Sequence, residues 1–244
     1  MKRRRSIGAA RNRSTGCDSV TLAPKRPQQI PLDLLHRPAS SRDDLVSSAS
    51  IAPALHVIDA YPNWPAPVVV IAGPPGSGKT HLAGAWQDMT GAASLAAQRI
   101  GPDGLLWAES GPVLIDDVDR ESIDETGLFH LINVVKSSGS HLLLTASTRP
   151  VNWPVALPDL VSRLKAAAVV EIGAPDDRLL EGVLTKLFSD RQVEVDPAVI
   201  QYIVKRMERS LESANDLVER LDQAALARKT RITRALVSEL VGDR

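Results

Sequence analysis

Gly73-Pro74-Pro75-Gly76-Ser77-Gly78-Lys79-Thr80 is the most informative stretch of this 244-residue sequence. It fits the pattern G-x-x-x-x-G-K-[ST], in which glycines let backbone N–H groups turn inward around phosphate oxygens. We expect Lys79 to reach the β and γ phosphates of a nucleotide, and Thr80 to ligate Mg²⁺. The next residue, His81, completes the set that we expect to hold ATP or ADP. Without its flanks, the same stretch is also compatible with a Gly/Pro-rich surface turn.

The sequence on either side of this loop predicts a strand–loop–helix unit. Residues 68–72 are a dense apolar run, as expected of a buried parallel strand. Residues 79–89 are expected to form a helix whose positive N-terminus faces the same phosphates. Further strands are expected at 113–115, 141–145 and 168–172, with helices at 124–138 and 160–165. Strands that alternate with helices predict an α/β fold with a parallel sheet in three αβα layers.

The sequence after Pro175 has a different pattern, with no further strand. Helices are expected at 177–190, 197–208, 211–228 and 233–241. Asp196-Pro197 is typical of a helix start, with Asp as the cap and Pro in the first turn. We therefore expect a small all-helical domain after the sheet. Before the sheet, the Ser-rich residues 40–50 are expected to open a helix that continues over 51–60.

An acidic motif follows one of the expected strands. Val113-Leu114-Ile115-Asp116-Asp117 has the form of a Walker B strand, which ends in an acid beside the bound nucleotide. We expect Asp116 to hold Mg²⁺, directly or through water, and Asp117 to polarise the attacking water as a general base. Without the phosphate-binding loop at residues 73–80 (the P-loop), a capped turn would explain an Asp pair just as well. Asp119 is interpreted as a solvated turn acid.

Two further elements point to the same edge of the sheet. In an open parallel sheet, ligands bind at the carboxyl ends of the strands, where Thr145, Ser147 and Thr148 follow one strand. These residues are candidates for orienting a water or sensing the γ phosphate, and a turn or helix cap is the alternative. Arg163, on the expected helix 160–165, could reach a neighbouring subunit's γ phosphate as an arginine finger. A surface salt bridge is an equally good interpretation of Arg163.

Charge and composition limit the classes of function. The formal net charge is +0, so there is no global case for binding nucleic acid or a membrane surface. Basic residues are concentrated in residues 1–27, which we expect to be a disordered tail, with a phosphate-binding arm as the alternative. No apolar run approaches the ~18 residues of a membrane span. The single cysteine, Cys17, excludes an intrachain disulfide and favours a reducing, cytoplasmic setting.

The motifs together resemble the AAA+ ATPases. The similarity rests on the P-loop, the Asp-Asp strand, the polar strand end, the helical C-terminal part and Leu157-Pro158-Asp159-Leu160-Val161-Ser162-Arg163-Leu164. It is closest to the DnaA branch and its Hda-like regulators, and it runs from about residue 28 to the C-terminus. The resemblance implies an AAA+ αβα domain over 35–174 and a helical lid over 175–244. It also implies no helix-turn-helix domain after the lid, unlike the initiator itself.

The resemblance further implies partners and an activity. An Hda-like protein would dock on the sliding clamp and meet ATP-loaded DnaA, placing Arg163 at the initiator's nucleotide. Hydrolysis would then leave DnaA in its inactive ADP form, so that initiation is negatively regulated. Such a protein acts mainly as an activator of its partner's hydrolysis and has weak ATPase activity of its own. Its own nucleotide would order it for the contact.

Residues 28–34 are similar to the clamp-binding peptide of that family. We expect Gln29 to make polar contacts at the mouth of a groove, and Leu32 and Leu34 to fill apolar pockets as an extended peptide, together with Ile30. The alternative is a strand or loop that packs on its own domain.

One position departs from the family pattern. AAA+ lids usually present an arginine to the nucleotide, and that position is Glu212 in an ungapped comparison. Arg209, one helical turn away, is the candidate substitute. A glutamate near phosphates repels them, so this departure leaves open the protein's own hydrolysis and its choice between ATP and ADP.

Two other classes of function stay open. The chain could be a self-assembling AAA+ ATPase, such as a helicase loader or remodeller, whose Arg163 acts on its own copies in a homo-oligomer. It could also be a scaffolding module that uses nucleotide only structurally. Sequence-specific DNA reading is not expected, and contact with DNA should be at most weak, non-specific and salt-dependent.

Overall fold

The computed structural model of the chain describes residues 45–241. Its strands are β1 (Val68–Ala72), β2 (Ala93–Ser94), β3 (Val113–Ile115), β4 (Leu142–Ala146) and β5 (Ala168–Glu171). The helices around them are α1 (Ala52–Asp59), α2 (Lys79–Thr90), α3 (Pro102–Ser110), α4 (Glu125–Ser138), α5 (Pro158–Lys165) and the short 3₁₀ helix η2 (Pro150–Asn152). Four helices follow, namely α6 (Asp177–Asp190), α7 (Pro197–Val204), α8 (Leu211–Arg228) and α9 (Arg234–Val241).

Over the described residues, the strands form one five-stranded parallel sheet in the order β2-β3-β4-β1-β5. The interior strand β1 pairs on both sides, with Val70 opposite Leu144 of β4 and Val169 of β5. All five β1 residues are buried, as an apolar strand covered on both faces should be. Because the strands are parallel, the loops after β1, β3 and β4 open at the same edge of the sheet.

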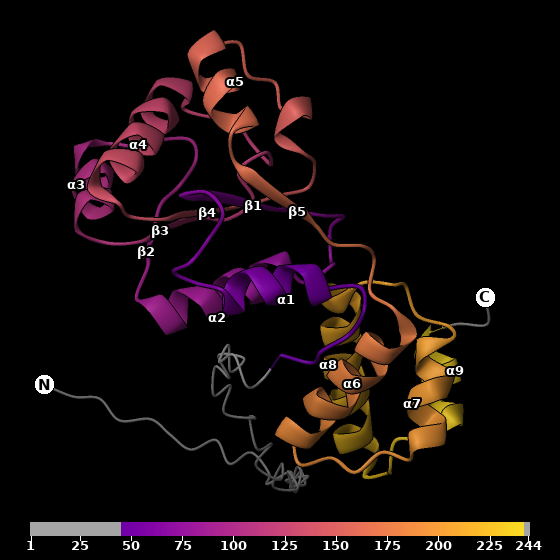
Figure 1. Ribbon diagram of the computed structural model, residues 1–244. Helices are drawn as coiled ribbons and strands as arrows, with labels where there is room; N and C mark the ends of the chain where they lie inside the picture. Colours follow the sequence, from indigo (N-terminus) through magenta and orange to yellow (C-terminus); the bar gives the residue numbers. More distant parts are fainter. Residues whose placement is uncertain (1–44, 242–244) are drawn as a thin grey trace, which may run out of the picture. The chain divides into compact units, whose positions relative to one another are not determined.

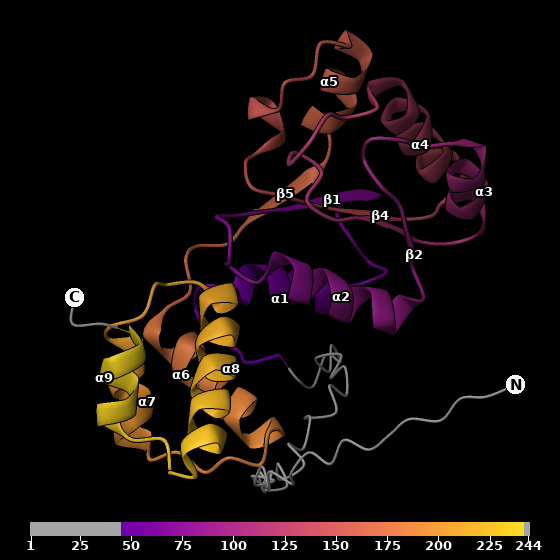
Figure 2. The same cartoon turned by 180° about the vertical axis from the view of Figure 1, so that it is seen from behind.

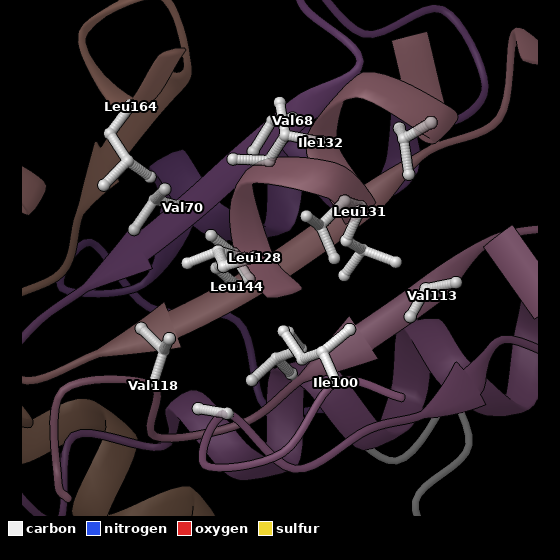
Figure 3. Packing of buried hydrophobic residues seen from close by; sticks show 14 of the residues in the cluster. Val68, Val70, Ile100, Val113, Val118, Leu128, Leu131, Ile132, Leu144 and Leu164 are labelled. Carbon is white, nitrogen blue, oxygen red and sulfur yellow. The ribbon is translucent and has the colours of Figure 1, made fainter. Parts of the chain in front are cut away.

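Helices cover both faces of the sheet (Figures 1 and 2). The helices α1 and α2 lie on one face, and α3, α4 and α5 lie on the other. Successive β1 residues alternate between the two apolar cores, because side chains alternate across a strand. Val68 and Val70 pack with Leu128 and Leu131 of α4 (Figure 3), whereas Val69 and Ile71 belong to the opposite core.

The four C-terminal helices have an apolar core of their own. Leu184, Phe188, Ile203 and Leu221 are among its fully buried members. Each of the first three helices begins with a side-chain cap at Asp176, Asp196 or Ser210. Such caps satisfy backbone N–H groups that the first helical turn leaves free. The prediction of an α/β sheet domain followed by a small helical domain is therefore confirmed.

Several predicted elements differ in their bounds. The Ser-rich segment does not open a helix within its described residues: α1 begins at Ala52. Instead, the Ser50 N–H donates to Asp176 Oδ2 at 3.3 Å, and the Ser50 carbonyl accepts from Gly173 N. Ser50 is therefore hydrogen-bonded to the loop between β5 and α6. The helix expected to reach residue 208 ends at Val204. None of the helices within residues 45–241 is long and apolar enough to cross a membrane.

Candidate functional site

The loop between β1 and α2 has the backbone that its glycines predict. Gly76 (φ 69°) and Gly78 (φ 98°) adopt left-handed conformations, which L side chains rarely tolerate. The 12-residue helix α2 begins directly after the loop, at Lys79. The positive end of its macrodipole therefore lies at the loop, which favours an anion there.

Two buried polar groups in this loop lack the partner that their chemistry requires. Lys79 is only 5% exposed, and its Nζ donates to the carbonyls of Gly73 at 2.9 Å and Pro74 at 3.1 Å. No carboxylate of the described residues forms an ion pair with it. The Ser77 hydroxyl is buried without any hydrogen-bond partner. Burying a cation without an anion is costly, and phosphate oxygens would satisfy both groups, so these residues fit a nucleotide phosphate.

The two predicted Mg²⁺ ligands are in contact, although they come from different elements. Thr80 lies in the first turn of α2, and Asp116 follows β3. The Thr80 hydroxyl donates to Asp116 Oδ2 at 2.9 Å. A hydroxyl and a carboxylate are the hard oxygen ligands that Mg²⁺ takes beside nucleotide phosphates. The pair therefore fits a magnesium ion at the edge of the sheet.

Thr145 connects both Walker B aspartates. Its buried hydroxyl donates to Asp116 Oδ1 and accepts from the Asp117 N–H at 2.7 Å. Asp117 itself has a left-handed backbone (φ 50°), which aspartate tolerates better than most residues. Because these partners occupy the hydroxyl, its role in this arrangement is to position the two acids. Contact with a water or a γ phosphate would fall to another residue.

Of the other two candidates at this strand end, Ser147 has the free hydroxyl, and Asp119 accepts from its N–H. The interpretation of Asp119 as a solvated turn acid is wrong. Its carboxylate accepts from Ser147 N at 2.7 Å and from both the N–H and the hydroxyl of Thr148 at 2.9 Å. Ser147 is exposed, and its hydroxyl makes no hydrogen bond within the described residues. Asp119 thus ties the turn after β4 to the turn after β3.

A cavity of about 580 Å³ joins these groups. The helical domain forms one wall, and the opposite wall comes from the loop, the β3 end and the β4 end. Its lining residues are Pro75, Gly76, Gly78, Lys79, Thr80, His81, Asp117, Arg120, Ser147, Leu211, Glu212, Asn215 and Asp216. The helical domain contacts the loop directly, because Leu211 N donates to the Gly76 carbonyl at 2.8 Å. Sequence reasoning missed Asn215 and Asp216, although both lie three to four residues after Glu212 in the expected helix 211–228.

Comparisons with known proteins agree with this geometry. Residues 179–241 match the family model described as the Hda lid domain. Domain III of the Thermotoga maritima replication initiation protein DnaA superposes with a TM-score of 0.71 and 18% identity, over 83% of this chain and 95% of that one. AMPPCP-bound DnaA from Aquifex aeolicus gives 0.64 and 20%, over 79% and 68%. At these identities the solved structures show the fold, and the lid match adds the family of the helical domain.

The helical domain is therefore similar to the Hda lid, and the described fold is similar to that of DnaA domain III. A relative by sequence, an uncharacterized protein of Haemophilus influenzae, is 27% identical over 118 residues. The match covers 48% of this chain and 51% of the relative, so the chain spans about half the length of that protein.

Arg163 lies apart from the cavity at the loop after β1. It is half-buried on α5 and does not line the cavity. Its side chain forms no ion pair or hydrogen bond with any described residue, so the salt-bridge interpretation finds no partner over residues 45–241. A free guanidinium on this helix is available to another molecule.

The lid presents carboxylates to the loop in place of an arginine. Glu212 lines the cavity, as the sequence comparison predicts, and Asp216 lies beside it. Arg209, the candidate substitute, does not line the cavity. Its guanidinium pairs with Asp177 at 2.7 Å and donates to the Pro175 carbonyl at 3.3 Å. The structure therefore brings Arg209 to the start of the lid and not to the phosphates.

His81 connects the phosphate side of the site to an apolar cleft. This cleft lies beside the cavity and is lined mainly by aliphatic side chains from α2, α6, the start of α8 and the segment before α1, including Ile51, Leu82, Leu179 and Val183. Burial, and then the charge of Lys186, lower the pKa of His81. The imidazole is therefore neutral near pH 7. A largely apolar cleft next to a phosphate loop is a surface on which a planar base could pack, and no local sequence pattern indicated it.

The predicted clamp-binding residues Gln29, Ile30, Leu32 and Leu34, and the basic tail of residues 1–27, lie outside the described residues.

Proposed function

We propose that this protein binds an adenine nucleotide, ATP or ADP, at the loop after β1. Lys79, Ser77 and the loop N–H groups would hold the phosphates, and Thr80 with Asp116 would hold Mg²⁺. When bound, the ion neutralises phosphate charge. The buried Lys79, which has no anionic partner among the described residues, and the unpartnered Ser77 hydroxyl support this proposal, as does the AMPPCP found in the structurally similar DnaA of Aquifex aeolicus.

The same protein is proposed to regulate replication initiation by stimulating hydrolysis of DnaA-bound ATP. The observation that carries this proposal is Arg163, a free guanidinium on α5 outside the protein's own cavity. An arginine offered to a partner's nucleotide stabilises the charge that develops during phosphoryl transfer. The Hda lid match supports DnaA as that partner. Residues 29–34 are proposed to dock the protein on the sliding clamp.

The protein's own hydrolysis is proposed to be weak. Glu212 and Asp216 place negative charge on the cavity wall that faces the loop, and no arginine from the described part of the lid lines that cavity. These carboxylates repel the negatively charged phosphates, whereas hydrolysis requires groups that stabilise negative charge in the transition state.

The test is hydrolysis of ATP by purified DnaA on DNA-loaded clamp, with wild type and Arg163→Ala. We expect wild type to accelerate hydrolysis and Arg163→Ala to abolish the effect, because a finger arginine is worth on the order of 10³-fold. The matched control is Lys165→Ala, which removes one exposed cation from the same helix. The Gln29→Ala variant tests clamp docking. If stimulation of DnaA requires docking on the clamp, this variant should fail to stimulate hydrolysis in the same assay. Equal stimulation by wild type and Arg163→Ala would rule out the finger.

A self-assembling ATPase is the second candidate, favoured by the complete set Thr80, Asp116 and Asp117 around the cavity. It predicts turnover without DnaA that rises with protein concentration and falls in Arg163→Ala. The regulator proposal instead predicts that intrinsic turnover is low and insensitive to Arg163.

A further inference from the structure

Positive charge gathers on one part of the lid, although the whole chain is neutral. Residues 197–207 and residues 228–238 contain no Asp or Glu. These stretches hold α7 and the start of α9, which pack together, and the Arg234 guanidinium donates to the Ala198 carbonyl at 3.3 Å. The four cations Lys205, Arg206, Arg231 and Arg234 are called the basic lid patch below.

An aromatic ring holds two of these cations together. The Arg206 guanidinium lies 3.8 Å from the ring centroid of Tyr202, and that of Arg234 lies 5.9 Å from the same centroid. Cation–π contact stabilises each guanidinium on the half-buried ring. The two like charges nevertheless repel one another, and a bound anion would relieve that repulsion.

No internal partner neutralises the patch. Within residues 45–241, none of its four side chains forms an ion pair, whereas Arg228 pairs with Glu239 at 2.6 Å elsewhere on the lid. Glu194 and Asp196 line the same groove as Arg231 and Arg234, but the Asp196 carboxylate caps α7 by accepting from Ala198 N at 2.7 Å. The four side chains therefore make no ion pair and are available to an external anion, with Glu194 and Asp196 as the opposing charges in the groove.

Helix stability does not account for Arg231 and Arg234 either. Lys205 and Arg206 follow α7 at its C-terminus, where cations are favourable. Arg234 is the first residue of α9 and Arg231 lies just before it, at the end of the helix where the macrodipole opposes positive charge. Each such cation costs about 0.3–1 kcal/mol, so their clustering requires another reason.

We propose that the basic lid patch docks the phosphate backbone of duplex DNA without reading its sequence. Guanidinium groups match phosphate oxygens in a bidentate geometry, and the backbone of DNA offers such oxygens at regular intervals. A membrane surface fits less well, because membrane-bound faces combine cations with exposed apolar anchors. None of the large hydrophobic side chains that the described residues leave exposed lies in α7 or in residues 231–237. The contact is independent of the nucleotide site.

The test is binding of the full-length protein to a short labelled duplex over a range of salt concentrations. The double variant Lys205→Ala/Arg231→Ala removes two exposed cations whose side chains form no hydrogen bond or ion pair within the described residues, so it should fold. We expect its slope of log K against log salt to be shallower by about 2, because each lost phosphate contact removes about 0.9. The control Arg99→Ala/Lys136→Ala removes the same charge from exposed positions outside the lid and should leave the slope unchanged.

Three outcomes would overturn the proposal. The slope of log K against log salt could become shallower by the same amount in both double variants, which would indicate a general charge effect. Alanine at Lys2, Arg3, Arg4 and Arg5 could remove all DNA binding while the patch variant retains it, which would assign the contact to the tail. The patch variant could lose binding to vesicles with anionic lipid or to a polyglutamate peptide but keep DNA binding, which would assign the patch to another partner. Circular dichroism of each variant checks that the lid is folded.

Discussion

Asp117 shows how a single strained residue can be held for chemistry. Its φ of 50° costs conformational energy, and the cost is offset because its N–H donates to the Thr145 hydroxyl. The same hydroxyl donates to Asp116, so one buried side chain sets the orientation of both acids. The Asp-Asp pattern predicts that acids stand at the strand end, but it does not reveal that β4 holds them.

Thr145→Val should therefore cost more than its change in volume implies. Valine fills the same space, but it leaves the Asp117 N–H without its acceptor and Asp116 Oδ1 without its donor. We expect the free energy of unfolding to fall by about 1–3 kcal/mol, the usual cost of an unsatisfied buried polar group. Urea denaturation followed by circular dichroism measures the change. Thr145→Ser keeps the hydroxyl and should recover most of the loss, and a valine variant as stable as wild type would contradict the bridging role.

At the scale of the elements, sequence pattern was sufficient where a segment was long or fully apolar. The bounds of β1, β3, α6 and α8 match the expectation, because dense apolar runs, caps and helical periodicity are local signals. No pattern predicted β2 or α3. A two-residue strand carries no alternation, and α3 contains Pro102 and Gly104 and leaves Leu106 and Trp107 exposed, so its apolar face is hard to recognise.

The site divides in the same way. The loop and the two Walker B aspartates are contiguous in sequence, so their residue types identify them. The roles of Asp119, Ser147 and Asp216 depend on which turns and helices meet in space. Asp119 lies 28 residues before Ser147, and only the pairing of β3 with β4 brings them together. Local sequence therefore could not assign these roles.

Contact between the lid and the loop can be tested at Gly76. A Cβ at this residue would lie 2.1 Å from the Ser210 hydroxyl oxygen, so the Gly76→Ala variant must displace the lid as well as strain the backbone. Gly91 has the same φ of 69° but no atom within 4 Å of an added Cβ. We expect Gly91→Ala to lower the unfolding free energy by about 1 kcal/mol through the backbone alone, and Gly76→Ala to lower it further. Urea denaturation of both variants measures the difference, and equal losses would mean that the lid does not press on the loop.

At the scale of the whole molecule, a net charge of zero conceals a separation of charge within the lid. Glu212 and Asp216 of α8 line the nucleotide cavity, whereas the basic lid patch lies on α7 and the start of α9. Glu212 also lies in the first turn of α8, where an acid stabilises the helix. The acidic wall should weaken the hold on a triphosphate more than on a diphosphate, because the triphosphate carries more negative charge.

Glu212→Arg tests this effect of charge on nucleotide preference. The substitution replaces a repelling carboxylate with an attracting guanidinium, and we expect the affinity for MgATP to rise several-fold relative to ADP, on the order of 1 kcal/mol. Because Glu212 is exposed, the gain should shrink as salt is raised. Competition titration of ATP against a fluorescent ADP analogue at two salt concentrations measures it. The control Glu219→Arg makes the same charge change on an exposed residue of α8 that does not line the cavity, and it should leave the ratio unchanged. If both variants shift the ratio equally, the preference depends on total charge; if neither does, the acidic wall does not act on the phosphates.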